Sequence, residues 1–265
     1  MAVRSIGSVL AGLVDAVFRP HRFVAVQTNT YSTSRLAALR QMADLSVIYL
    51  TNLAAYALPL TLAGIGVRTS AAVPAAFAGL VGGYVPNPAP LWRLLVGFGQ
   101  NSLFITIATV VTLVTYHVGV VLTRNSRGLL QSMHTVVYTT SAYLAAIFSG
   151  VWFLTTNEGV AAAREFVRAL QAKFVYAIID FLGADVGLPS GRPGEITVST
   201  FSTTGQWVLV LLVVSAVYYF LSLYFGARIN HQMGRSSAVL AVLAVFLSPI
   251  LYVAGSVILA TTTIP

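Results

Sequence analysis

Four histidines are the residues of widest chemical use in this sequence: His21, His117, His134 and His231. A neutral imidazole binds zinc, copper or haem iron, and it also exchanges protons near neutral pH. Metal sites usually combine histidines at short helical spacings with a carboxylate or a thiolate, whereas these four come from separate segments of a chain without cysteine. The pattern therefore favours histidines that bond across helix interfaces or contact headgroups. We expect no catalytic residue, no metal site and no bound cofactor.

Two of the histidines flank a turn between apolar runs, in the stretch TYHVGVVLTRNSRGLLQSMHTVVYTTSAYL. The pattern predicts a helical hairpin, and Gly128 in the turn permits the backbone to reverse at low steric cost. If the turn is helical, Arg124 and Arg127 share a face from which both can reach lipid phosphates. Tyr138 is expected to face the preceding helix, where its hydroxyl can bond to His117 or to a threonine.

Few polar side chains fall inside the apolar runs. The candidates for intramembrane polar contacts are Asn52, His117, His134 and Tyr138. No Asp, Glu, Lys or Arg falls in the middle of a run, which leaves an ion-coupled transporter few groups to use. Threonines recur at every third residue from Thr106 to Thr115. They could line a polar path, but such threonines more often bond their own helix backbone or a neighbouring helix.

The composition indicates that lipid is the main solvent of this chain. Hydrophobic residues make up 57% of the 265 residues, charged residues make up 8%, and the mean hydropathy is +0.83. Such a chain cannot surround its core with a polar shell. Stretches of about 18 or more apolar residues can each cross a bilayer, and they occur at about 45–67, 102–123, 133–155, 206–226 and 237–260. The predicted fold class is an all-α integral membrane protein, a five-transmembrane-helix bundle.

The charged residues predict the orientation of these spans, because Lys and Arg accumulate in short cytoplasmic loops. With a cytoplasmic N-terminus, nine basic and two acidic residues fall inside, against six basic and five acidic residues outside. The stretch SAAVPAAFAGLVGGYVPNPAPLW, between the first two spans, is too interrupted by proline and glycine to cross, and we predict that it forms an interfacial or re-entrant loop. Counting it as a span would move the later arginine loops outside. We therefore expect a cell-membrane protein with an extracytoplasmic C-terminus and with Trp92, Trp152 and Trp207 at the outer interface.

Two segments outside the spans are predicted to be amphipathic helices that lie on the membrane. In RSIGSVLAGLVDAVF, near the N-terminus, apolar residues recur at spacings of three and four residues. In the third loop, an apolar stripe runs from Val160 to Phe181 and includes Leu170, Phe174 and Ile178. The stretch GEITVSTFSTTGQ that follows alternates enough for a short strand, although a polar loop fits it equally well.

The predicted organisation is a cytoplasmic N-terminal segment, 1–44, followed by a membrane domain, 45–260, which includes an outer loop at 156–205. The net charge is +8, but the sequence contains no polar domain that could form a nucleic-acid site. Attraction to anionic lipid headgroups is therefore the simpler interpretation of this charge. The candidate lipid or partner contacts are the basic residues on the cytoplasmic side: Arg19, Arg22, Arg124, Arg127, Arg228 and Arg235.

Two stretches resemble the Yip family of Ypt-interacting membrane proteins in its short bacterial and archaeal form: DAVFRPHRF and the hairpin YHVGVVLTRNSRGLLQSMHTVVYTTSAYL. The family has a polar residue late in its second span, a glycine in the cytoplasmic turn and a tyrosine on the next helix. His117, Gly128 and Tyr138 match those positions. The resemblance implies five spans and a cytosolic N-terminus. Eukaryotic members have a glycine and a proline where Val137 and Ala142 stand here, so the resemblance does not extend to a Rab GTPase partner.

Two functions stay open from the sequence. The first is a non-enzymatic Yip-like multi-pass membrane protein that binds anionic lipid headgroups, membrane-protein partners or a second copy of itself. The second is a permease or an accessory subunit of a larger membrane transport or respiratory complex, in which His117 and the threonine row line a path or pack on a partner. No motif of a hydrolase, an ATPase or a metalloprotease occurs, so we expect no enzyme.

Overall fold

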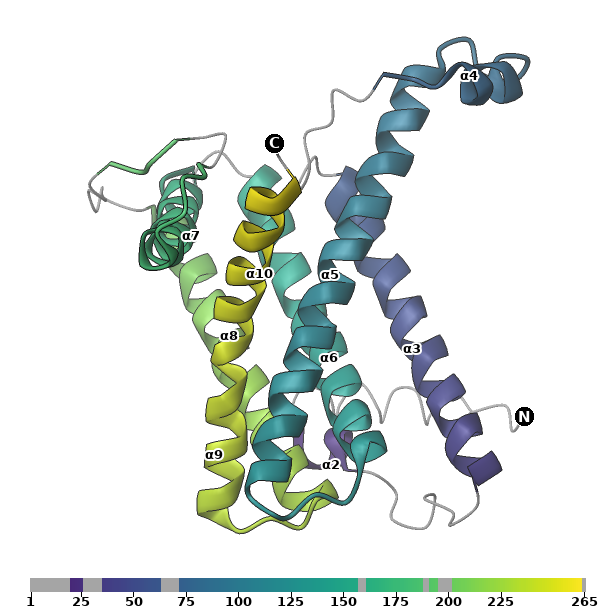
Figure 1. The fold of residues 1–265 in the computed structure, drawn as a ribbon. Helices are drawn as coiled ribbons and strands as arrows, with labels where there is room; N and C mark the ends of the chain where they lie inside the picture. The colour runs from purple at the N-terminus through teal and green to yellow at the C-terminus, as the bar shows by residue number, and fades with distance from the viewer. Residues whose placement is uncertain are drawn as a thin grey trace.

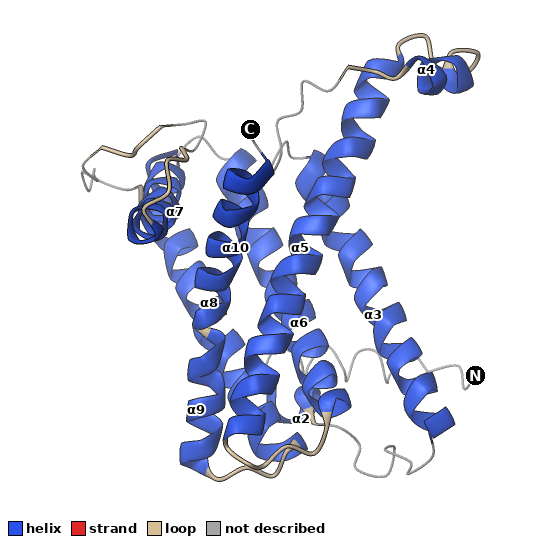
Figure 2. Ribbon diagram, in the orientation of Figure 1, coloured by secondary structure: helices blue, strands red, loops and turns tan. Residues whose placement is uncertain are grey.

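The computed structural model describes residues 20–25, 35–62, 72–156, 161–187, 191–194 and 202–263. Over these residues the chain forms helices and no strand (Figure 1, Figure 2). The helices are α2 (Pro20–Val24), α3 (Arg35–Leu62), α4 (Ala75–Val81), α5 (Pro88–Leu122), α6 (Leu129–Thr156), α7 (Ala161–Leu182), α8 (Thr203–Asn230), α9 (Arg235–Val245) and α10 (Leu247–Thr263). The all-helical part of the predicted fold class is therefore confirmed.

The long helices stand side by side as a bundle, and α7 lies across one end of it (Figure 1). Helix α6 packs most extensively against α8, α5 packs against α9, and α3 packs against α5 and α6. We name the two ends of the bundle by their contents. The hairpin end holds α2, the start of α3, the α5–α6 turn and the α8–α9 turn, and the α7 end holds α4, α7 and the end of α10 (Figure 1).

Four helical segments of the described residues are long and apolar enough to cross a membrane: 38–62, 88–122, 203–230 and 235–262. They overlap the first, second, fourth and fifth predicted spans. The predicted third span, 133–155, coincides with α6, which is not among these four. The length and composition of the chain thus fit a multi-pass membrane protein.

The tightest core lies near the hairpin end, where α5, α6, α8 and α9 meet. Its fully buried side chains include Tyr116, Val120, Val136 and Leu223. Many apolar side chains on the outside of the bundle are exposed instead, as expected for surfaces that lipid covers. The bundle therefore fixes the hairpin end most firmly, and this is the end that carries the polar side chains described below.

Helix α5 is longer than the predicted second span. It has 35 residues, because it begins at Pro88, within the last residues of the Pro-rich stretch, and continues through 93–101 into the predicted span. The side chain of Asn87 caps the helix by accepting a hydrogen bond from the backbone N–H of Ala89 at 3.1 Å. Pro88 occupies the first turn, where its missing N–H is not needed. The prolines therefore start this helix, and Ala75–Val81 of the same stretch form the short helix α4.

The predicted fifth span is one apolar run but two helices. Helix α9 ends at Val245, Phe246 forms a turn, and α10 begins at Leu247. Pro249 explains the interruption, because its ring opposes the carbonyl of the residue four positions earlier, which is Val245. The two helices continue in nearly the same direction along the bundle (Figure 1).

Several predictions concern residues outside the described part of the chain. The predicted N-terminal amphipathic helix, Arg19 and most of the possible strand at 194–206 fall there. Where that stretch is described at its end, Thr203–Gln206 form the first turn of α8, with Ser202 as its cap. Helix α3 begins at Arg35 and runs without a break across the predicted boundary between residues 44 and 45.

Helix α7 coincides with the predicted outer-loop helix, but its apolar residues divide between two faces. Tyr176 and Ile179 are buried against Val257 of α10. Leu170, Phe174 and Phe181 of the predicted stripe are exposed, Phe181 at 88%. One face of α7 thus attaches the helix to the bundle, and a second apolar face has no cover among the described residues.

Candidate functional site

The α5–α6 turn is a compact reversal at the hairpin end. Gly128 has a φ of +115°, which an L side chain rarely adopts, and this agrees with its predicted role. Arg124 also has a positive φ, +59°, which is uncommon for a residue other than glycine. Asn125 holds the turn by donating from its side chain to the carbonyl of Thr123 at 2.8 Å. The turn is not helical, so the condition under which Arg124 and Arg127 would share a helix face is not met.

The α8–α9 turn lies beside the first one, and polar bonds join the two. His231 caps the end of α8, and Gln232 follows it with a φ of +53°. The backbone N–H of Arg127 donates to Nδ1 of His231 at 3.2 Å. The guanidinium of Arg127 also donates to the side-chain oxygen of Gln232. Each turn contains a non-glycine residue in a costly backbone conformation, and their mutual contacts hold both conformations in place.

A buried chain of side chains continues from His231 into the bundle. Nε2 of His231 lies 3.1 Å from Oγ of Ser132 on α6, and Ser132 lies 2.9 Å from Nδ1 of His117 on α5. Ser132 is fully buried, and His231 is 2% exposed. We call these three residues the His–Ser–His chain. The prediction that His117 bonds across a helix interface is confirmed, although its partner Ser132 was not foreseen.

The direction of each hydrogen bond in the His–Ser–His chain follows from one fixed donor. The backbone N–H of Arg127 can only donate, so Nδ1 of His231 accepts and the proton of the neutral ring is on Nε2. Nε2 then donates to Ser132, whose own hydroxyl proton is free to go to His117. In this tautomer, Nε2 of His231 carries a proton and donates to Ser132, and the lone pair of Nδ1 accepts from Arg127. Neither ring nitrogen then has a free lone pair for a metal ion.

A second buried contact ties three helices together just above the turns. Asn230, at the end of α8, donates from its side chain to the carbonyl oxygen of Val24 at 3.0 Å and to the hydroxyl of Thr135 at 2.8 Å. Thr135 also lies directly against Gly226, where an added Cβ would collide with it. These contacts fasten α2 and α6 to α8, and they explain why α6 and α8 approach so closely.

The remaining intramembrane polar residues are placed on α3 and α6. Asn52 donates to the hydroxyl of Ser141 at 2.6 Å, which joins α3 to α6. His134 stacks on the ring of Tyr138, one turn further along α6, with ring centroids 4.4 Å apart. Nδ1 of His134 is buried and has no hydrogen-bond partner within the described residues, while the residue as a whole is half-buried. His134 is also outside the His–Ser–His chain.

The threonine row on α5 bonds to its own helix backbone or to neighbouring helices, as its more usual interpretation predicts. Thr109 and Thr115 donate to carbonyl oxygens one turn earlier in their own helix, at 2.8 and 3.0 Å. Thr106 accepts a hydrogen bond from the hydroxyl of Tyr49 on α3 at 3.3 Å. These bonds favour helix packing over an open polar path.

The predicted basic contacts gather at the hairpin end, apart from Arg19, which lies outside the described residues. Arg22, Arg124, Arg127 and Arg235 are exposed, and Arg228 is partly buried. They come from α2, the α5–α6 turn, the last turn of α8 and the start of α9, which lie far apart in the sequence and at the same end of the bundle (Figure 1). The fold therefore brings basic residues from separate segments to the hairpin end.

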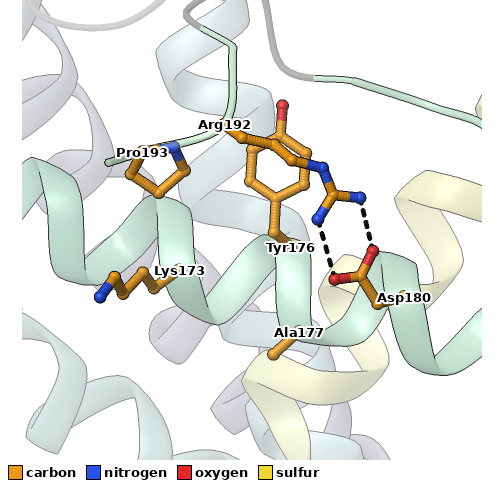
Figure 3. Close-up of a pocket in the computed structure, with 6 residues that line it drawn as sticks. All are labelled: Lys173, Tyr176, Ala177, Asp180, Arg192 and Pro193. Atoms are coloured by element: carbon orange, nitrogen blue, oxygen red, sulfur yellow. Dashed lines mark hydrogen bonds and ion pairs between the residues drawn. The ribbon is translucent and has the colours of Figure 1, made fainter. Parts of the chain in front are cut away.

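A shallow pocket of about 300 Å³ lies at the α7 end (Figure 3). Arg192 forms two hydrogen bonds to Asp180, at 2.6 and 3.0 Å, and lies over the ring of Tyr176. The hydrogen bonds and the charge of Arg192 lower the pKa of the Asp180 carboxyl. Both side chains are more than half exposed, and the pair attaches residues 191–194 to α7.

The chemistry available to the His–Ser–His chain is limited by its burial. A serine between two imidazoles has the donors and acceptors of an activated nucleophile. Ser132 is 0% exposed, however, and no substrate can reach its oxygen in this conformation. The chain can join two turns and respond to protons, which is a conformational role.

No protein-family model matches this chain, and no match is found among curated proteins or solved structures. The class of the protein therefore follows from its own features. It is an all-helical protein with four helices long and apolar enough to cross a membrane among its described residues.

Proposed function

We propose that this chain is a non-enzymatic multi-pass membrane protein that binds the anionic surface of the cell membrane through its hairpin end. The observation that carries the proposal is the difference in charge between the two ends. The arginines of the hairpin end in the described part of the chain are Arg22, Arg35, Arg40, Arg124, Arg127, Arg228 and Arg235. Among the described residues of this end, Asp44 is the only acid.

The α7 end differs because its charges largely neutralise each other. Arg168 pairs with Glu165 at 3.6 Å, and Arg192 pairs with Asp180. Unpaired arginines near a leaflet of anionic lipid each contribute on the order of 1 kcal/mol to membrane attraction. Since arginine-rich turns favour the cytoplasm, the proposal includes a cytoplasmic hairpin end, a cytoplasmic N-terminus and an extracytoplasmic C-terminus.

The proposal counts α6 as a fifth span. This helix has 28 residues, a length of about 42 Å, which exceeds the hydrocarbon core of a bilayer. It packs along α8 and also contacts α5 and α3, all of which are candidate spans. The exposed apolar face of α7 is then suited to lie in the opposite interface, with Leu170, Phe174 and Phe181 toward the acyl chains.

The resemblance to the Yip family is consistent with this proposal. The hairpin motif corresponds to the α5–α6 turn, with His117 late in α5, Gly128 in the turn and Tyr138 on α6. A membrane-protein partner, or a second copy of the chain, is part of the same proposal. The exposed arginines are the side chains that such a partner would contact.

A titration with lipids tests the proposal. We would measure the melting temperature of the purified chain in a non-ionic detergent while adding phosphatidylglycerol or phosphatidylcholine. Phosphatidylglycerol is expected to raise the melting temperature more, and the difference should shrink at high salt. A triple variant, Arg22→Gln, Arg124→Gln and Arg235→Gln, is expected to lose most of this difference.

The matched control removes three charges at the other end: Arg93→Gln, Arg168→Gln and Lys173→Gln. This variant is expected to respond to phosphatidylglycerol as the unmodified chain does. Equal losses in the two triple variants would mean that lipid binding follows net charge alone and would refute a specific role for the hairpin end.

The second candidate function is a permease or an accessory subunit of a larger complex. A buried hydroxyl favours it: Thr139 on α6 is 1% exposed, and its oxygen has no hydrogen-bond partner among the described residues. A buried hydroxyl without a protein partner can hydrogen-bond to a water molecule or a polar substrate inside the bundle. Purification from the native membrane in mild detergent tests this candidate, because stoichiometric co-purifying subunits would favour it over the first.

A further inference from the structure

The two turns at the hairpin end are joined through the ring of His231. Its Nδ1 accepts a hydrogen bond from the backbone N–H of Arg127 on one turn, and its Nε2 donates to Ser132 at the start of α6. The ring centroid of Tyr116 on α5 lies 6.2 Å away. His231 is therefore the group on the α8–α9 turn that contacts the α5–α6 hairpin on both of its sides.

This arrangement requires the neutral form of His231. Both ring nitrogens of a protonated imidazole are donors. A proton on Nδ1 would point at the N–H of Arg127, and two donors cannot share a hydrogen bond. Ser132 can still accept from Nε2, and the side chain of Arg127 keeps its bond to Gln232, but the hydrogen bond from the backbone N–H of Arg127 to His231 is lost. Neutral His231 thus holds the hairpin, and charged His231 releases it.

Among the described residues, the elements packed around His231 carry no carboxylate that could favour its charged form. The titratable and charged groups on the elements packed around it are His117 and Tyr116 of α5, Arg124 and Arg127 of the first turn, His134 of α6, Arg228 of α8, Arg235 of α9, and His21 and Arg22 of α2. Burial, followed by the charges of His117 and Arg127, lowers the pKa of His231 to about 4 from an ordinary value of 6.5.

We propose that His231 is a proton-operated latch, which holds the α5–α6 hairpin against the α8–α9 turn when neutral and releases it when protonated. The direction of the response follows from linkage. A released turn exposes His231 to water, where it binds protons more readily than in the closed form, so acid favours release. The closed form is fully favoured above about pH 6.5 and is progressively lost as the pH falls toward 4. This latch does not depend on whether the hairpin end binds lipid.

A distance measurement on the full-length chain tests the latch. The chain has no cysteine, so Leu129→Cys and Ser236→Cys introduce a unique pair of exposed labelling sites on the two sides of the latch. Spin labels at these sites should give a narrow distance distribution at pH 7.5 and a broader, longer one near pH 4. The ratio of released to closed form should rise by roughly 150-fold over this range, and helix content by circular dichroism should stay constant.

Two variants separate the latch from other acid effects. In His231→Asn, the side-chain oxygen can accept from Arg127 but does not titrate, so the narrow distribution should persist at both pH values. In His231→Ala, the broad distribution should be present at both. His21→Asn is the matched control, because it removes an exposed histidine of the same end and should keep the acid response.

Three results would overturn the proposal. The first is an unmodified chain whose distribution stays narrow down to pH 4. The second is an acid response that survives in His231→Asn. The third is a loss of helix content at the same pH as the broadening, which would mean general unfolding instead of a local release.

Discussion

The side chain of Asn230 on α8 donates a hydrogen bond to the hydroxyl of Thr135 on α6, at 2.8 Å and away from solvent. The same amide also bonds the carbonyl oxygen of Val24, so one residue connects three helices. Asn230 is 6% exposed and Thr135 is fully buried. Hydrogen bonds between helices in lipid are modest individually, but a buried acceptor that loses its donor has no water to replace it.

We therefore predict that Asn230→Ala lowers the free energy of unfolding by about 2 kcal/mol, because two buried bonds are lost. Unfolding in a titration of denaturing detergent measures this change. Asn52→Ala is the comparison, since it removes a single partly buried bond to Ser141 and should cost about half as much. If the two variants are equally stable, Asn230 does not have the connecting role that its contacts indicate.

The close approach of α6 and α8 gives a second prediction. A Cβ added at Gly226 would collide with the side chain of Thr135, so Gly226→Ala should cost about 1–3 kcal/mol of stability. Adding Thr135→Ser removes one of the colliding atoms and should recover part of that loss. Gly79→Ala on α4 is the control, because an added Cβ there meets nothing within 4 Å. Thermal melting of the purified variants decides the matter, and a Gly226→Ala chain that melts like the control would contradict this packing.

The sequence predicted the elements well because apolar length alone identifies helices that can cross a membrane. It located the ends less well, and the physical reasons differ from case to case. Helix α5 begins at Pro88, because proline is tolerated in the first turn of a helix. In the sequence, the same prolines interrupt the apolar stretch, so the predicted span began later. The last span is divided at Phe246 because Pro249 acts on a carbonyl four residues away.

The contacts of the His–Ser–His chain and of Gln232 could not be predicted from the sequence, for a different reason. Ser132 and Gln232 are common polar residues beside turns, and no spacing marks them as partners. Their roles depend on two turns, about 100 residues apart in the chain, meeting at one end of the bundle. The four histidines come from separate segments of the chain, and only the fold selects His117 and His231 as the pair that shares Ser132.

The proposed orientation gives a third prediction, which uses single cysteines in this cysteine-free chain. Ser126→Cys lies on the α5–α6 turn, and Lys173→Cys lies on α7, and both sites are exposed. In intact cells a membrane-impermeant maleimide should label Lys173→Cys and leave Ser126→Cys unlabelled until the membrane is opened. The reverse pattern would mean that the hairpin end faces outward and would remove the basis for the proposed cytoplasmic surface.

The last prediction concerns the charge of the α5–α6 turn itself. Arg124 and Arg127 are exposed at the hairpin end, and each is expected to favour the cytoplasmic side by on the order of 1 kcal/mol through the anionic leaflet. Replacing both in Arg124→Glu with Arg127→Glu should therefore produce a mixed population, in which part of the Ser126→Cys label becomes accessible from outside. Arg127 also donates to Gln232, so Arg127→Gln is needed to separate loss of that bond from reversal of charge. That neutral variant should keep a single orientation while losing some thermal stability. If the charge-reversed chain keeps both its orientation and its stability, these arginines act neither on insertion nor on the turn, and the basic surface would have to serve a partner instead of the lipid.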